Sequence, residues 1–148
     1  MKAIIQRVSK ALVRVENEKI AQIKCGMMVL LGVKSDDTEK EAELLAKKTV
    51  NLRIFSDKEG KMNLSLLDIQ GEVLVVSQFT LYGNCKKGRR PSFIDAALPE
   101  KADLLYQYYV QCLKNNNISV QTGQFQAMMQ VELINEGPVT IILDSAEL

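Results

Sequence analysis

The strongest β signal in the chain is the run VLVVSQFTL at residues 73–81. Its first half is apolar and rich in valine, which is typical of a strand covered on both faces. In a strand that continued to Leu81, Ser77 and Phe79 would point to one face and Gln78 and Thr80 to the other. Polar side chains on a buried strand need hydrogen-bond partners or a cavity. The run therefore predicts either a ligand site or a strand end that approaches solvent.

Hydrophobic periodicity places further strands on both sides of this run. We expect them over residues 5–7, 13–16, 20–24, 27–31, 53–55, 129–133 and 139–143 and around Val120, with a hairpin tip at Asn17-Glu18 and turns at Cys25-Gly26 and through Asp57 and Gly60.

Two helices are expected between these strands. The first begins at Asp36–Thr38, where Glu39 follows Asp36 in capping-box register. The second runs from about Pro99 to about Asn115. Its buried face should carry Leu105, Tyr109 and Cys112.

The length of 148 residues suits one domain spanning the whole chain. The expected fold class is α+β, with curved, mostly antiparallel β-sheets in a layered or barrel-like arrangement. Its two main helices should pack on one face. Each of the four phenylalanines (Phe55, Phe79, Phe93 and Phe125) is expected in the core.

The composition excludes several kinds of chemistry. The chain has no histidine, so it has no imidazole base and no Ser-His-Asp or Cys-His system. Its three cysteines are far apart in sequence, which argues against a disulfide framework, a redox pair or a structural metal. No phosphate-binding glycine motif and no acidic cluster for a catalytic metal is present. We therefore expect no cofactor and no metal, and a cytoplasmic protein without a membrane-spanning segment or signal peptide.

Four basic residues (Lys86, Lys87, Arg89 and Arg90) lie close together, although the net charge of the chain is only +1. Gly88 and Pro91 make this segment loop-like. Such a patch attracts a phosphate backbone, or it is simply a solvated loop.

Gly137-Pro138 interrupts two apolar stretches near the end of the chain. Proline cannot donate to a sheet ladder, and glycine lets another backbone approach closely. One interpretation is a hairpin loop between two strands. The other is a rigid backbone element that projects into a ligand site.

Two separate motifs resemble the signatures of the D-aminoacyl-tRNA deacylases. The first is VVSQFTLY at residues 75–82, and the second is NEGPVT at residues 135–140. The similarity extends along the chain through Gln6-Arg7-Val8, Arg53-Ile54-Phe55-Ser56-Asp57, Gly60-Lys61-Met62-Asn63, Arg90-Pro91-Ser92-Phe93, Gln121-Thr122-Gly123, Phe125 and Met129.

This resemblance implies a homodimeric cytoplasmic hydrolase that cleaves the ester between a D-amino acid and tRNA. It implies that glycyl-tRNA is also a substrate and that L-aminoacyl-tRNA is refused. Aminoacyl-tRNA is then the partner, with neither DNA nor a membrane involved.

The resemblance also assigns roles to residues. The backbone amides of Phe79 and Thr80 would bind the ester carbonyl, with Thr80 against the scissile group and Ser77 and Gln78 supporting it. Gly137 and Pro138 would form a cis dipeptide that enters the partner subunit's site, fixed by Arg7. Phe125 and Met129 would shape a pocket for the terminal adenosine.

An activated aminoacyl ester does not need a strong base, so a chain without histidine can still cleave it. Thr80 has no neighbour in sequence that could deprotonate it, which favours a positioning role over a covalent one. Two alternatives stay open. One is a non-catalytic RNA-binding module that uses residues 86–90, and the other is a small-molecule amidase or lactonase with Thr80 as nucleophile.

Overall fold

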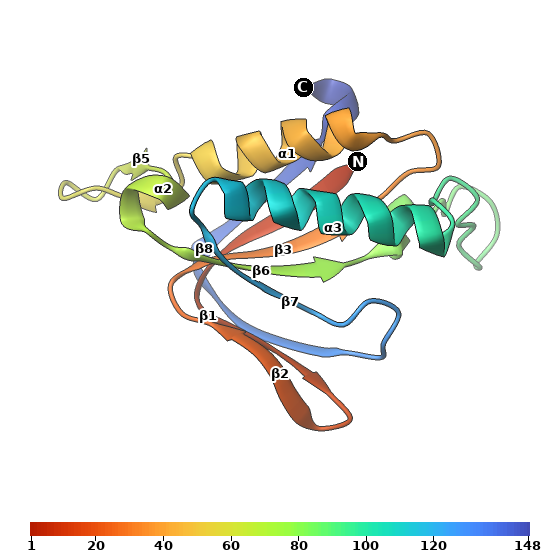
Figure 1. The fold of residues 1–148 in the computed structure, drawn as a ribbon, viewed down its shortest axis with the longest axis horizontal. Coiled ribbons are helices and arrows are strands. Elements are labelled where there is room, and N and C mark those ends of the chain that lie inside the picture. The colour runs from red at the N-terminus through yellow and green to blue at the C-terminus, as the bar shows by residue number, and fades with distance from the viewer.

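The computed structural model describes all 148 residues and has one six-stranded sheet with helices on one side (Figure 1). The strands of this sheet are β1 (Lys2–Val15), β2 (Glu18–Ile23), β3 (Gly26–Gly32), β6 (Glu72–Ser77), β7 (Ser119–Thr122) and β8 (Gln130–Asp144). The long strand β1 pairs antiparallel with β2 and β3 along one edge and with β8 along the other. β6 then pairs in parallel with β3 on one side and with β7 on the other.

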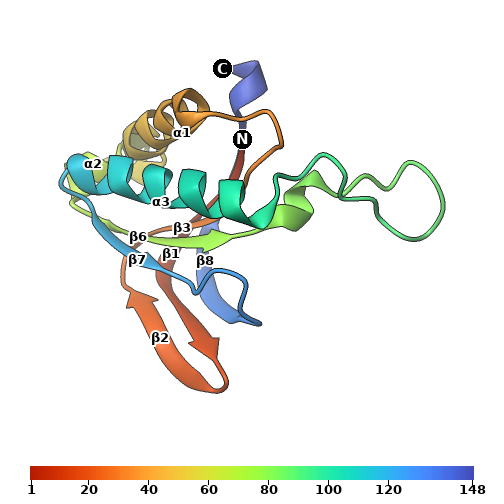
Figure 2. The ribbon, with the colours of Figure 1, turned by 45° about the vertical axis from the view of Figure 1, so that its right-hand side comes forward.

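The remaining elements are short, apart from two helices. They are α1 (Glu39–Asn51), β4 (Phe55–Ser56), β5 (Met62–Leu64), α2 (Leu66–Ile69), the 3-10 turn η1 (Phe79–Tyr82), α3 (Pro99–Asn115) and the 3-10 turn η2 (Ser145–Glu147). α1 and α3 lie on the same face of the sheet (Figures 1 and 2). No helix is both long and apolar enough to cross a bilayer. Because four of the six strand pairings are antiparallel, the expected α+β fold class is confirmed.

The apolar side chains form two clusters. The larger one lies between the sheet and the two main helices, which are joined by a buried hydrogen bond between Thr49 Oγ1 and Tyr109 Oη (2.8 Å). The smaller one lies inside the curled half of the sheet and includes Val8, Ile23 and Leu74. Because the helices cover only one face of the sheet, the carboxyl end of β6 and most of β8 lie outside the larger cluster.

Helix α3 begins and ends where the sequence predicts, and its expected residues Leu105 and Tyr109 are buried. The start of α1 differs, because Thr38 is the N-cap and Glu41 completes the capping box. The Asp37 carboxylate instead binds the nitrogen of Met1 (2.6 Å) and the N–H of Lys34 (2.6 Å). The prediction of a capping box at Asp36 and Glu39 is therefore wrong.

The first hairpin turns at Glu16 and Asn17, one residue earlier than expected. Both residues have positive φ angles (50° and 69°), which suits a tight turn that follows the twist of the strands.

The prediction of a strand to Leu81 is wrong beyond Ser77. Strand β3 ends at Gly32, and β7 pairs only as far as Val75 of β6. Gln78 still donates its N–H to Leu31 O (2.8 Å), but later residues have no strand beside them. The chain therefore leaves the sheet and forms η1.

The prediction of two strands separated by a hairpin at Gly137-Pro138 is also wrong. β8 is one strand, and both of its halves pair with β1. Gln6 is paired with Thr140 and Val8 with Asn135, so Arg7 alone faces the four residues 136–139. The dipeptide therefore lies in a large bulge on an edge strand.

Candidate active site

An apolar cleft of about 680 Å³ opens at the carboxyl end of β6, and 12 of its 16 lining residues are hydrophobic. Ser77, Gln78 and Phe79 line it at the point where β6 passes into η1. Phe125 and Met129 line it from the segment between β7 and β8. The start of α3 closes the remaining side. Five of the residues predicted from the resemblance thus share one cavity.

Two main-chain donors lie at the start of η1, next to this cleft, which Phe79 lines and Thr80 adjoins. The hydrogen bonds of η1 begin with Leu81, whose N–H donates to Gln78 O (3.3 Å). A 3-10 turn bonds each N–H to the carbonyl three residues earlier, so its first amides have no acceptor inside the turn. These are the amides of Phe79 and Thr80, and both residues are exposed. The turn can therefore offer two adjacent N–H groups to a carbonyl oxygen.

Thr80 is held by its neighbour. Gln78 Nε2 donates a hydrogen bond to Thr80 Oγ1. A side-chain amide does not accept a proton at neutral pH, so this contact orients the hydroxyl without activating it. The geometry suits Thr80 as a hydrogen-bond donor to a ligand.

The floor of the cleft is fixed from below by α3. Val75 O accepts hydrogen bonds from Tyr106 Oη (2.9 Å) and from Gly123 N (2.9 Å). Burial raises the pKa of Tyr106, so its phenol stays protonated as a donor. A Cβ on Gly123 would lie 2.7 Å from Met129 Sδ, so glycine is what lets Met129 reach the cleft.

The basic residues lie in a loop that projects from the end of η1 (Figure 2). Lys86, Lys87, Arg89 and Arg90 are all exposed. Two backbone hydrogen bonds between Asn84 and Ser92 (2.7 and 3.0 Å) close the loop at its base. The patch is therefore a neighbour of the cleft rather than part of its lining.

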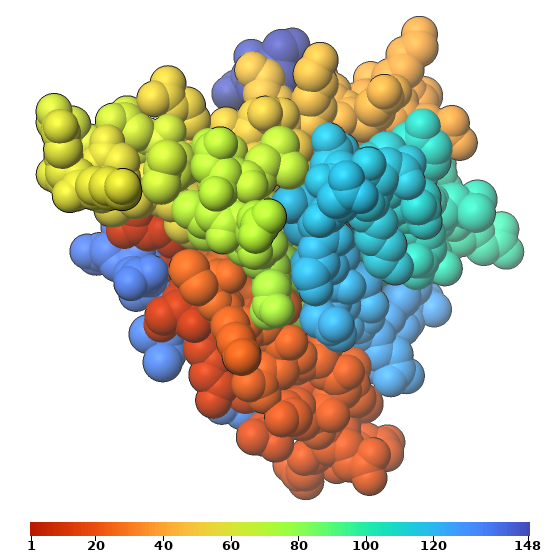
Figure 3. Space-filling view, turned by 60° about the vertical axis from the view of Figure 1, so that its left-hand side comes forward, coloured from red at the N-terminus to blue at the C-terminus, as the bar shows by residue number.

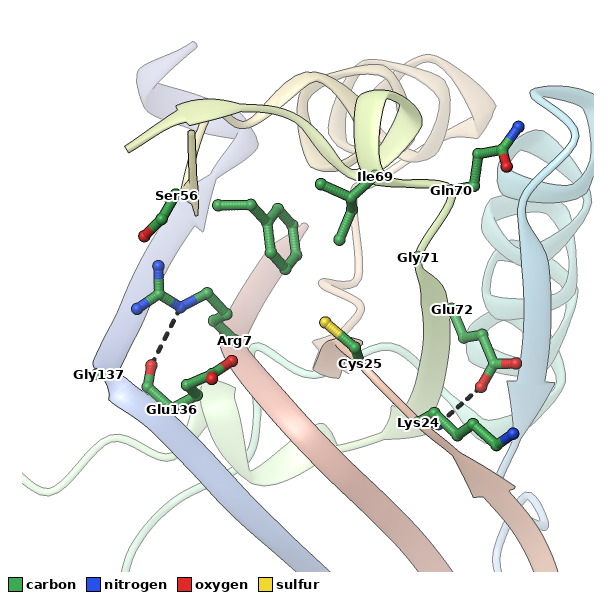
Figure 4. Close-up of a pocket in the computed structure, with 11 residues that line it drawn as sticks. Arg7, Lys24, Cys25, Ser56, Ile69, Gln70, Gly71, Glu72, Glu136 and Gly137 are labelled. Carbon is green, nitrogen blue, oxygen red and sulfur yellow. Dashed lines mark hydrogen bonds between the residues drawn. The ribbon is translucent and has the colours of Figure 1, made fainter. Parts of the chain in front are cut away.

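The Gly137-Pro138 dipeptide lies elsewhere on the surface, and its peptide bond is cis. Arg7 Nε donates to Glu136 O (3.1 Å; Figure 4), and Arg7 Nη1 donates to Ile54 O (2.5 Å). The Asn135 side chain accepts from Val139 N (2.9 Å), which closes the far side of the bulge. The polar side chains on both flanks thus fix the backbone of the bulge.

A second cavity of about 510 Å³ adjoins the dipeptide. It lies on the side of the molecule where the segment from β4 to α2 (yellow to green) lies above β1 and β8 (red and blue) (Figure 3). The Cys25 side chain points into it, near Arg7 (Figure 4). Burial raises the pKa of the Cys25 thiol, the Glu136 carboxylate raises it further, and the Arg7 guanidinium opposes both. Cys25 is therefore a poor nucleophile.

One chain does not bring the two motifs together. Arg7 pairs with Met27, and Met27 pairs with Val73, four residues before Ser77. At about 4.8 Å between strands and about 3.3 Å per residue, the bulge and the cleft are roughly 20 Å apart.

Sequence reasoning missed part of the site. Phe79 and Phe93 are 54% and 37% exposed, so the expectation that they belong to the core is wrong. Their ring centroids are 5.0 Å apart in an edge-to-face contact. Phe93 belongs to the motif Arg90-Pro91-Ser92-Phe93, which contributes to the family resemblance. The sequence does not show that its ring packs against η1; only the fold does.

Comparisons with known proteins show which family this chain resembles. The family model for D-Tyr-tRNA(Tyr) deacylase matches residues 4–144. A D-aminoacyl-tRNA deacylase of Geotalea uraniireducens is 60% identical over 145 residues, covering 98% of this chain and 94% of the relative. One of Thermosipho africanus is 57% identical over 145 residues, covering 98% and 97%.

Solved structures show the same fold. A protein described as c-Myc DNA Unwinding Element Binding Protein superposes with a TM-score of 0.91 at 42% identity, covering 97% of this chain and 98% of that one. A probable eukaryotic D-amino acid tRNA deacylase shares the fold at 18% identity, with a TM-score of 0.83 and coverage of 96% and 97%. The chain belongs to the D-Tyr-tRNA(Tyr) deacylase family.

Proposed function

We propose that the chain hydrolyses the ester between a D-amino acid and tRNA, accepts glycyl-tRNA mischarged on tRNA-Ala, and refuses L-aminoacyl-tRNA. Deacylation of D-aminoacyl-tRNA follows from family membership. The selectivity, the cytoplasmic role in chiral proofreading and the residue roles are our own extension of it.

The observation that carries this proposal is the pair of free amides at the rim of the apolar cleft. The N–H groups of Phe79 and Thr80 can bind the ester carbonyl and the negative charge that develops on it. Removing one preorganised donor of this kind typically lowers a rate by about 10²–10³. An ester is activated enough for such stabilisation to suffice without an imidazole base.

Thr80 then acts as a positioner. Its hydroxyl accepts from Gln78 and keeps its own proton for the substrate. Ser77, half-buried at the end of β6, holds the strand from which η1 begins. Phe125 and Met129 give the apolar surface on which the terminal adenosine packs.

With no base in reach of Thr80, the 2′-hydroxyl of the terminal ribose is the remaining group that can orient or activate water. Transfer RNA ending in 2′-deoxyadenosine should therefore be deacylated much more slowly than normal tRNA at equal binding. An undiminished rate would refute this role.

We further propose that the active site is completed by a second copy of the chain. β8 is an edge strand of 15 residues, and only Leu143 is buried in it. Its outward face exposes Ile134 (59%) and Ile142 (70%), and its second edge has no strand partner. A two-fold pairing along this edge would carry Gly137 and Pro138 of each copy toward the cleft of the other.

A backbone wall of this kind accounts for chirality. With the ammonium and carbonyl of the substrate held fixed, the wall leaves room for a hydrogen where an L residue would place its Cβ. The L enantiomer is refused by a steric clash, whereas glycine passes because it has a hydrogen at both positions.

The decisive experiment measures deacylation of D-Tyr-tRNA, L-Tyr-tRNA and a free D-Tyr ester by the wild type and by Thr80→Ala. We expect cleavage of D-Tyr-tRNA, slower cleavage by the variant, and negligible turnover of the other two substrates. A non-catalytic RNA-binding module would bind tRNA without cleaving it. An amidase or lactonase with a nucleophilic Thr80 would cleave the free ester and form a trappable acyl-enzyme.

A further inference from the structure

Phe93 lies where the basic loop returns to the body of the molecule. Its ring meets that of Phe79 at a centroid distance of 5.0 Å and an angle of 69° between planes. Edge-to-face pairs of this geometry are attractive beyond the area that they bury. Both rings line the apolar cleft, and Phe79 is the first residue of η1.

The Phe93 ring also lies against the residue after η1. A Cβ on Gly83 would be 3.1 Å from Phe93 Cε1 and 3.0 Å from Thr80 O. Gly83 N in turn donates to Thr80 O (2.9 Å). The ring therefore contacts the turn near both of its ends, where only glycine leaves enough room.

The backbone that carries Phe93 is anchored to the sheet. Phe93 O accepts from Ala96 N (3.0 Å), and Ala97 N donates to Val33 O (3.0 Å) just past the end of β3. Ser35 N donates to Asp95 O (3.0 Å). Behind the ring, the Asn84–Ser92 pair closes the basic loop. The backbone that carries Phe93 is thus anchored, and its ring contacts the exposed start of η1 and Gly83 just after its end.

We propose that Phe93 is a positioning residue of this site, which holds η1 so that the N–H groups of Phe79 and Thr80 stay directed at the ester carbonyl. The inference rests on the proposed function. The end of η1 is held by the buried Tyr82, but Phe79 and Thr80 at its start are exposed and have few contacts to restrict them. Small errors in the direction of catalytic hydrogen-bond donors lower the reaction rate strongly. The aromatic contact of Phe93 should therefore affect the rate more than it affects the free energy of unfolding.

The test replaces Phe93 by leucine, which keeps an apolar side chain and removes the aromatic edge. We expect the single-turnover rate constant on D-Tyr-tRNA to fall about ten-fold, with KM nearly unchanged. The same loss should appear with 3′-O-(D-tyrosyl)adenosine, which is too short to reach the basic loop. Phe93→Tyr should restore the rate. Ile94→Ala is the matched control, because Ile94 is an exposed neighbour (83%) outside the cleft lining.

A readout independent of activity is the amide signals of Phe79 and Thr80 in a ¹⁵N spectrum. They should shift or broaden in Phe93→Leu but not in Ile94→Ala. Unchanged signals with an unchanged rate would overturn the proposal. A defect confined to KM on tRNA would also overturn it. A third contradicting outcome is a loss of rate in both Phe93→Leu and Phe93→Tyr that follows the decrease in Tm of each variant. If the wild type fails to cleave D-Tyr-tRNA, the proposed function falls, while the amide signals still report whether Phe93 orders the turn.

Discussion

The cleft at the end of β6 and the bulge at Gly137-Pro138 are built in opposite ways. The cleft is concave and apolar, and its useful polar groups are main-chain amides left free by a short turn. The bulge is exposed, and its backbone is fixed by polar side chains, with Arg7 on one flank and Asn135 on the other.

This difference shows what each region lacks. The cleft has donors and an apolar surface but no wall that could distinguish two enantiomers. The bulge has a stiff wall but no apolar cavity of its own for an adenosine. The two regions are complementary, yet they are roughly 20 Å apart within one chain by strand spacing. Substitutions in each region test whether they cooperate across two copies.

The largest effect is expected from Gly137→Ala. Gly137 has a φ of +124°, and an added Cβ would lie 2.9 Å from Arg7 Nη2 and 2.9 Å from Val139 Cγ2. The side chain would displace the bulge and its contact with Arg7. We expect D-Tyr-tRNA deacylation to fall at least about 100-fold, as measured by kcat/KM, because misplacement by about 1 Å costs this much in positioned reactions.

Gly60→Ala is the matched control for that substitution. Gly60 also has a positive φ (+79°), but a Cβ added there would meet no atom within 4 Å. We expect a small loss of stability and normal kinetics. If Gly137→Ala kept full activity on D-Tyr-tRNA and still failed to cleave L-Tyr-tRNA, the dipeptide would have no part in the mechanism.

The second prediction asks whether the bulge acts in the other copy. Thr80→Arg places a long side chain at an exposed position beside the cleft and should block it without unfolding the chain. When this variant is mixed and refolded with Gly137→Ala, half of the dimers contain one intact site, so activity should return to about a quarter of the wild-type value. A mixture as inactive as its components would mean that both regions act within one chain.

A smaller effect is expected from Thr80→Ala. It removes one hydrogen-bond donor from the substrate but leaves both main-chain amides in place, so we expect a loss of about ten-fold in kcat. Rapid-quench experiments should detect no acyl-enzyme in the wild type. Abolished activity together with a trapped acyl-Thr80 would instead establish a covalent mechanism.

The smallest effect on chemistry is expected in the basic loop. Replacing Lys86, Lys87, Arg89 and Arg90 by alanine should raise KM for tRNA several-fold and leave kcat nearly unchanged. The slope of log affinity against log salt should decrease by about one for each phosphate group that the loop no longer neutralises. Turnover of 3′-O-(D-tyrosyl)adenosine serves as the control and should not change. An unaltered salt slope would identify residues 86–90 as a solvated loop.

Local signals were sufficient for some elements. Pro99 at the first turn and the asparagines after Leu113 bound α3 as predicted, because capping chemistry depends only on near neighbours. Two capping boxes were possible at the start of α1. Thr38 is the N-cap, whereas Asp36 binds Lys34 Nζ (3.0 Å) and Asp37 binds the distant nitrogen of Met1. Sequence spacing does not reveal such competing partners.

The site was predicted only in part, for a related reason. The polar residues after Val76 lie where a cleft opens, but the alternating directions expected for them were wrong, because β6 loses its neighbours at Ser77 and the chain turns. Gly137-Pro138 was correctly seen as a break in pairing. That both flanking stretches pair with β1 depends on residues more than 100 positions away.

The sequence by itself determined the α+β class and helix α3, because periodicity and capping depend on residues a few positions apart. It also excluded imidazole chemistry through its composition, and it singled out the segments 75–82 and 135–140 through their motifs. Tertiary structure alone decided that amides become free at Phe79 and Thr80, that Phe93 lies on the turn, and that Arg7 fixes a bulge. Each of these depends on which strand lies opposite, and strand pairing is set by the burial of the whole sheet.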